Sequence, residues 1–259
     1  MSTDRLDLDF TPKPGAAPLS RQVLAQASME SRLMLRNGEQ LLLAVVIPVI
    51  VLIGGVQGAE HLGIEFSRRP VDVFAPGVLA LAVMSTAFTS LAIATGFERR
   101  YGVIKRLGSS PLPRSGLLLG KVGALLLVEV LQIAMISVVA FALDWQPHAS
   151  LLAVLLTVAL GTAAFASLGL FVAGVLRAEA TLAAANLIYL LLLAAGAVVL
   201  PSSAYGGFGA VARLLPSGAL GDSLRHAFWS GSFEWTSMLV LLVWTGIGTV
   251  LTARTFTWE

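Results

Sequence analysis

The sequence predicts an all-α integral membrane protein with six transmembrane helices, and three observations lead to this prediction. Hydrophobic residues make up 56% of the 259 residues and charged residues only 12%, about half the charged share of a soluble domain. Six apolar runs are each long enough to cross about 30 Å of hydrocarbon as a helix. Basic residues are concentrated in alternate connecting segments, as expected of a multi-pass protein.

The six predicted spans are separated by short polar segments and carry at most one charged residue deep inside. They lie at about 40–58, 74–97, 115–143, 150–176, 181–200 and 235–253. The third and fourth runs are longer than a bilayer requires, so we expect tilt or extension beyond the membrane. Residues 39–259 are therefore expected to form one six-span transmembrane domain.

The N-terminal region divides into two parts. Residues 1–18 contain Pro12, Pro14 and Pro18, a composition that disfavours a helix and predicts a flexible tail. Residues 19–38 mix apolar residues with arginines, and we expect a loosely amphipathic helix at the membrane surface. A simple solvated lead-in to the first span is the alternative.

The placement of Lys and Arg predicts the orientation. Of the 17 basic residues, four lie in the predicted outer loops and the remaining 13 in the predicted inner segments; the four are Arg68, Arg69, Arg213 and Arg225. Basic residues favour the cytoplasmic side. Both termini are therefore expected in the cytoplasm, with the protein in the plasma membrane or the bacterial inner membrane.

Residues 201–234 are too polar to span and precede the last span. After Pro216, the apolar residues Leu220, Leu224 and Phe228 fall on one helical face. Asp222 near the start and Arg225 near the end complement the helix dipole. We expect a short amphipathic helix at the outer membrane surface.

The inner segment 98–121 is basic, and two glycines and two prolines divide it. Gly102 and Gly108 bracket a stretch that favours a short helix, and Pro111 and Pro113 break the chain before the third span. Its charge has two interpretations. It is either ordinary positive-inside topology or a docking surface for a cytoplasmic partner.

This segment resembles the permeases of ATP-binding cassette (ABC) type-2 transporters, especially the bacterial drug-resistance exporter branch. The resemblance extends over nearly the whole chain, and departs from the family pattern at Arg100, where a second glutamate is usual. It is carried by Glu98, Arg99, Gly102, Leu107, Pro111, Gly120 and Lys121.

The resemblance implies a non-catalytic membrane subunit that exports an amphiphilic or drug-like compound, such as an antibiotic. ATP and Mg²⁺ would bind a separate ATPase chain, and a second permease copy, identical or different, would complete a dimer within membrane lipid. The residues expected to couple to the ATPase are Glu98, Arg99, Arg100, Gly102, Lys105, Arg106, Leu107 and Pro111.

No catalytic, metal or cofactor site is expected in this chain. Gly116 to Lys121 has one residue too few for a phosphate-binding loop, and the next residue, Val122, cannot ligate Mg²⁺. The sequence contains no cysteine and no pair of histidines with metalloprotease spacing. The net charge of +2 gives no reason to expect nucleic-acid binding.

Polar residues inside the predicted spans are candidates for the substrate path. Glu129 and Gln132 share a face of the third span, hydroxyl groups line the second, and two residues three apart face together on the fifth. The alternative is that neighbouring helices satisfy Glu129 in its neutral form and that the hydroxyls serve helix packing. The candidates are Ser85, Thr86, Thr89, Glu129, Gln132, Asn186 and Tyr189.

Two other classes of function stay open at this point. A proton-coupled secondary transporter would use Glu129, although such carriers are built from internal repeats and the 98–121 segment has no counterpart between the fourth and fifth spans. A membrane protein with a structural role and no transport is the other alternative.

Overall fold

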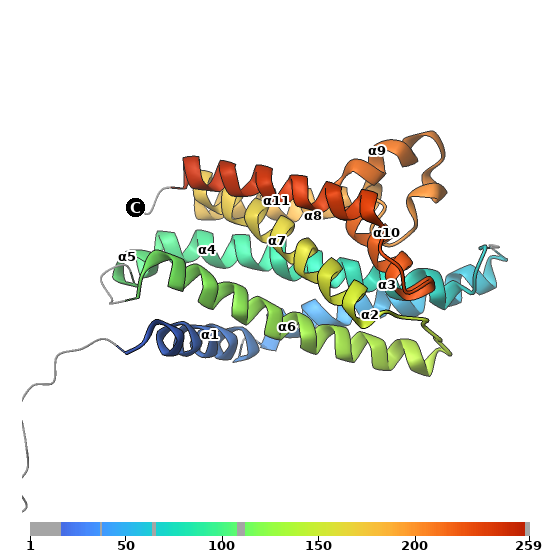
Figure 1. The fold of residues 1–259 in the computed structure, drawn as a ribbon, viewed down its shortest axis with the longest axis horizontal. Helices are drawn as coiled ribbons and strands as arrows, with labels where there is room; N and C mark the ends of the chain where they lie inside the picture. The colour runs from blue at the N-terminus through green and yellow to red at the C-terminus, as the bar shows by residue number, and fades with distance from the viewer. Residues whose placement is uncertain (1–16, 37, 64–65, 108–111, 257–259) are drawn as a thin grey trace, which may run out of the picture.

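The computed structural model describes residues 17–36, 38–63, 66–107 and 112–256, and every regular element in these ranges is helical (Figure 1). The first half contains α1 (Leu19–Arg36), α2 (Gly38–His61), α3 (Pro70–Met84), η1 (Ser85–Ser90), α4 (Leu91–Arg100), α5 (Val103–Leu107) and α6 (Arg114–Ala142). The second half contains α7 (Leu151–Val175), α8 (Ala178–Ala195), η2 (Ser202–Phe208), α9 (Gly209–Leu214), α10 (Pro216–Trp229) and α11 (Trp235–Thr255).

Within the described residues, five helical segments are long and apolar enough to cross a membrane. They are Pro70–Arg100, Ser115–Ala142, Leu151–Val175, Ala178–Ala195 and Trp235–Thr255, and they correspond to the second to sixth predicted spans. The first predicted span falls in α2, where the described side chains begin at Val45 and the apolar stretch Val45–His61 is shorter. The count of six spans therefore stays a prediction.

The second predicted span is a helical column of 31 residues that changes its winding in the middle. α3 and α4 are α-helical, whereas η1 between them is a π-helix. Its carbonyls lie against α7: a Cβ atom added to Gly169 would stand 2.9 Å from the Phe88 oxygen. Gly169 therefore allows close contact between α7 and η1.

This column is the centre of the bundle. Its most apolar stretch is 72% buried, whereas the corresponding stretch of α8 is only 17% buried. α7 packs mainly against α11, where a Cβ atom on Gly248 would stand 2.2 Å from the Ser167 hydroxyl. α8 therefore contributes an exposed apolar face at the edge of the bundle.

The N-terminal helix α1 lies alongside the first half of α6 (Figure 1). Its expected position at the membrane surface stays a prediction. A Cβ atom on Gly120 would stand 2.5 Å from Gln26 Cγ, and one on Gly123 would stand 3.3 Å from the Ala27 Cβ. The face that α1 buries is polar, because Gln26 and Glu30 point inward while Leu24 and Leu33 stay exposed.

The predicted short helix before the last span is α10, and its position at the outer membrane surface stays a prediction. α10 is packed among α3, α7 and α11, and most of its residues are buried. Arg225, expected to be at the outer surface, is only 1% exposed. Its guanidinium donates to the carbonyls of Val198 at 2.9 Å and Val199 at 2.5 Å and pairs with Asp222 at 3.2 Å.

These contacts explain why the fifth span ends early. The predicted span runs to residue 200, but α8 ends at Ala195 and Ala197 has a φ of 53°. The carbonyls of Val198 and Val199 consequently have no partner in a continuing helix, and Arg225 supplies their hydrogen bonds instead.

Candidate functional site

One end of the bundle gathers the residues expected to couple to an ATPase. We call it the basic end: the last turn of α4, all of α5, the start of α6 and the α7–α8 connection (Figure 1). The chain turns from α4 into α5 at Gly102, whose φ of 66° favours glycine. The predicted short helix is confirmed as α5, on which Lys105 and Arg106 are exposed.

The helix of the second span continues further than expected, so that Glu98, Arg99 and Arg100 lie in the last turn of α4. Each has a different contact. Arg99 donates to the carbonyls of Ala173 and Leu176 near the end of α7. Arg100 pairs with Glu179 of α8. Leu107 ends α5, and Pro111 lies outside the described residues.

Glu98 belongs to a group of three charges that joins three helices. Lys121 of α6 lies 2.6 Å from a carboxylate oxygen of Glu98 on α4 and 3.1 Å from Glu30 on α1. Gln26 donates to Glu30 at 2.9 Å. The side chains of Lys121 and Glu30 are each 11% exposed and that of Glu98 is 20% exposed. Because removing one partner of a buried ion pair is costly, this group ties α1, α4 and α6 together.

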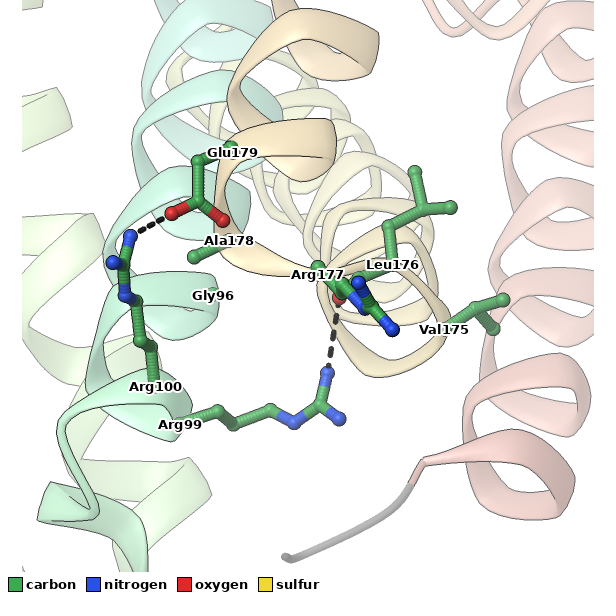
Figure 2. Close-up of a pocket in the computed structure, with 8 residues that line it drawn as sticks. All are labelled: Gly96, Arg99, Arg100, Val175, Leu176, Arg177, Ala178 and Glu179. Atoms are coloured by element: carbon green, nitrogen blue, oxygen red, sulfur yellow. Dashed lines mark hydrogen bonds and ion pairs between the residues drawn. The ribbon is translucent and has the colours of Figure 1, made fainter.

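A cavity of about 510 Å³ opens at the basic end, between the end of α4 and the α7–α8 connection. Figure 2 shows Arg100 against Glu179 on one side and Arg99 reaching toward Leu176 on the other. The exposed Arg177 lies in the two-residue connection between α7 and α8. Gly96 also lines the cavity, and a Cβ atom there would contact Thr181 at 3.3 Å.

The polar residues inside the spans form separate pairs rather than one cluster. The Thr86 hydroxyl donates to Gln132 at 2.8 Å, and the Thr162 hydroxyl donates to Glu129 at 2.7 Å. Glu129 and Gln132 are each 1% exposed. These contacts are the ones that the packing interpretation predicts, although they leave a role in transport untested.

The remaining candidates lie toward α8. Tyr189 is half-buried, within hydrogen-bonding reach of Ser85, whereas Asn186 is exposed on the outer face of α8. The Thr89 hydroxyl is buried and has no hydrogen-bond partner among the described residues. Asn186 and Tyr189 are therefore three residues apart but differ in environment.

A second cavity, of about 650 Å³, lies between α6, α7 and α11. Apolar side chains and a row of hydroxyls line it, including those of Thr245, Thr249 and Thr252. Lys121 lies at its margin, and Thr162, the partner of Glu129, contributes to its wall. None of the seven substrate-path candidates is among the lining residues in the described part of the chain.

Sequence reasoning missed several of these residues. Glu30, Thr162, Arg177 and Glu179 were not singled out, because each acquires its neighbours only through tertiary packing. The one signal available in the sequence was a polar residue such as Glu30 in the expected amphipathic helix, and this residue lies on the buried face of α1. Among the described residues, no group of three or more His, Asp or Glu side chains is arranged to hold a metal ion.

Comparison with known proteins agrees with this architecture. A family profile described as ABC-2 type transporter matches residues 21–229, from α1 to the end of α10 and most of the chain. A comparison with curated proteins found no match. The chain is thus a multi-pass membrane protein. It belongs to the ABC-2 type transporter family and corresponds to the membrane permease domain of such transporters.

Proposed function

We propose that this chain is the permease subunit of an ATP-driven exporter. A separate ATPase chain hydrolyses ATP, and a second permease copy completes the transporter. The basic end is cytoplasmic, as are both termini. The coupling residues are those of α4 and α5, with no catalytic residue in this chain.

The observation that carries the proposal is the direct connection of α5 to α4, which Lys121 in turn links to α6 and α1. α5 follows α4 after a single turn, and Lys121 joins Glu98 of α4 to α6 and α1. A displacement of α5 by an ATPase is therefore passed to the central helical column and to α6 together. A docking surface on a freely moving loop would lack this property.

The cavity between α6, α7 and α11 supports an amphiphilic substrate. Its volume of about 650 Å³ falls within the usual range of small-molecule sites. Apolar walls with hydroxyl groups suit a drug-like molecule that arrives from the membrane. The cavity lies in the half of the bundle nearest the basic end, since Lys121 and Phe256 both line it.

The exposed face of α8 supports association with a second permease. Leu187, Leu190 and Leu191 are each more than half exposed, and Asn186 lies among them. An exposed polar residue on an apolar helix in lipid favours a protein partner. Whether the two copies are identical is decided by the composition of the purified complex.

The experiment that tests this proposal is purification of the tagged chain from its native membrane in mild detergent. We expect an ATPase in roughly equal amount. The variant Lys105→Glu/Arg106→Glu reverses two exposed charges on α5 and is expected to lose most of this ATPase. Arg99 is left unchanged because its bonds to α7 carbonyls hold the fold.

The matched control is Arg68→Glu/Arg213→Glu, which reverses two exposed charges at the other end of the bundle. It should retain the ATPase. An intact wild-type protein that purifies without any ATPase would contradict the proposal and favour the proton-coupled alternative based on Glu129. Equal loss of ATPase in both variants would remove α5 as the docking surface.

A further inference from the structure

The cavity shown in Figure 2 has the charge and shape of an anion site. Three guanidinium groups and one carboxylate line it: Arg99, Arg100 and Arg177 against Glu179. Arg100 is paired with Glu179. Arg177 is exposed, and its guanidinium makes no hydrogen bond or ion pair with any residue that the structure describes. A guanidinium with its donors available is a preferred partner of phosphate oxygens.

We propose that this cavity binds the phosphate of an anionic phospholipid from the inner leaflet of the membrane. Arg177 is the principal phosphate contact, Arg99 adds positive charge to the cavity while bonded to the carbonyls of Ala173 and Leu176, and the apolar walls hold the first part of an acyl chain. This inference concerns a lipid site and does not depend on the proposed ATPase partner.

The start of α8 adds donors at the same place. Arg177 is the N-cap residue, and its side chain makes no capping bond, so that the first backbone N–H groups of the 18-residue helix lack a helical partner. Thr181 in the first turn is fully buried, and its hydroxyl has no hydrogen-bond partner among the described residues. Thr181 packs against Gly96 of the cavity wall, with its hydroxyl 3.4 Å from the position of an added Cβ, and is not itself among the described residues that line the cavity.

The depth of the cavity in the membrane favours a lipid over a free anion. Three candidate spans have their ends here: Pro70–Arg100, Leu151–Val175 and Ala178–Ala195. The ends of spans lie at the level of the headgroups. Val175 is 53% exposed at the rim, and Leu176 and Ala178 continue the apolar wall. A phosphate with an attached acyl chain satisfies both parts of this lining.

The cavity lies apart from the α5 charges that the docking test reverses, and it shares Arg99 and Arg100 of α4 with the proposed coupling residues. Lys105 and Arg106 project from α5, whereas the cavity is formed by α4 and the α7–α8 connection. A recess with apolar walls between span ends is accessible from the bilayer. An acidic loop of an ATPase is the competing occupant, and the experiment distinguishes the two.

The test uses the full chain reconstituted in nanodiscs containing phosphatidylcholine with one-fifth phosphatidylglycerol. After extraction in mild detergent, the lipids retained per protein are counted by mass spectrometry. We expect phosphatidylglycerol to be enriched over its share in the nanodisc. Arg177→Gln should lower its retention about fivefold, the effect of removing one basic charge near an anionic surface. Arg177→Lys should retain part of it.

Arg213→Gln is the matched control, since Arg213 is exposed on α9 and distant from the cavity in sequence and fold. It should leave retention unchanged, and thermal unfolding in detergent should show that all variants are folded. Equal retention in Arg177→Gln and Arg213→Gln would overturn the proposal. So would complete displacement of the lipid by millimolar inorganic phosphate, or unchanged lipid with loss of ATPase recovery in Arg177→Gln.

Discussion

Glu129 combines a carboxyl group with a position in the interior of a membrane helix. Thr162 of α7 donates to one of its oxygens, and the other oxygen has no partner among the described residues. Hydrogen bonds between membrane helices contribute about 0.6 kcal/mol on average. Such a bond is too weak to make Glu129 essential for folding, and therefore its role in transport can be tested directly.

We expect Glu129→Gln to keep ATP-dependent transport within about twofold of wild type, because the amide oxygen still accepts from Thr162. The measurement is uptake of a fluorescent amphiphile into inverted vesicles that contain the chain and its ATPase. Glu129→Leu, which removes the acceptor, should lower stability by about 1 kcal/mol or less. Loss of uptake in Glu129→Gln, with normal ATPase recovery, would instead indicate a titrating group in the transport cycle.

Arg225 is also a buried ionisable residue but, unlike Glu129, it has several close partners. Burial lowers the pKa of its guanidinium to about 10, and the nearby Asp222 carboxylate opposes that shift. The side chain therefore stays charged at neutral pH. Its charge is tolerated because two backbone carbonyls and one carboxylate surround it. Gly77 leaves room for this group, since a Cβ atom there would stand 2.6 Å from the guanidinium.

At the scale of elements, α1 is an amphipathic helix whose polar face is the buried one. Glu30 and Gln26 contact α6, whereas Leu24 is 68% exposed and Leu33 is 60% exposed. In a membrane this arrangement is favourable, because lipid accepts the apolar face and Lys121 neutralises the polar one. The helix therefore needs both the bilayer and α6.

The absence of cysteine from the chain allows this packing to be tested by a designed disulfide. A Cβ atom on Gly123 would stand 3.3 Å from the Ala27 Cβ, close to the separation that a disulfide requires. We expect Ala27→Cys/Gly123→Cys to cross-link under mild oxidation, observed as a mobility change on a non-reducing gel after cleavage between α1 and α6.

The control pair Ala27→Cys/Val138→Cys places the second cysteine on an exposed face about four turns further along α6 and should not cross-link. Equal cross-linking in both pairs would indicate a mobile α1. No cross-link in either pair would favour the helix at the membrane surface that the sequence predicts.

The sequence predicts helix positions well and helix faces poorly, for a physical reason. α6, α7 and α11 begin and end within about two residues of the predicted spans, because long apolar runs are required to cross a bilayer. Lipid and protein interior are both apolar, so that periodicity does not reveal which face contacts protein. The burial of α10 and the docking of α1 were missed for this reason.

The candidate site was likewise predictable from the sequence only in part. The basic segment and α5 could be predicted because charge and glycine positions are local properties of the sequence. Lys121 with Glu30, and Arg100 with Glu179, join residues on different helices. Local pattern gives no indication of such pairs. The π-helix at Ser85–Ser90 was missed as well, since its hydroxyls fit a regular helical stripe equally well.

For the whole molecule, the number of crossings decides the orientation of the termini. If α2 crosses the membrane, α1 and α5 lie on the same side; if it does not, they lie on opposite sides. We expect Arg21→Cys and Lys105→Cys to be protected from a membrane-impermeant maleimide in intact cells, and Arg213→Cys to be labelled. All three residues are exposed in the bundle.

Inverted vesicles should give the reverse labelling pattern, which controls for cysteines that are simply unreactive. Labelling of Arg21→Cys and protection of Lys105→Cys in the same intact cells would mean that α2 does not cross and that the described five spans are the full set. The protection of Lys105→Cys on α5 would then be the only labelling result that places the basic end in the cytoplasm.

The docking of α1 on α6 has a consequence for the order in which the molecule is assembled. Synthesis begins at the N-terminus, so that Glu30 emerges from the ribosome well before Lys121. Until α6 arrives, the polar face of α1 has no protein partner and must remain hydrated at the edge of the bilayer. α1 thus reaches its final position only after α6 has been made, and a nascent chain that stalls before residue 121 has no partner against which to place it.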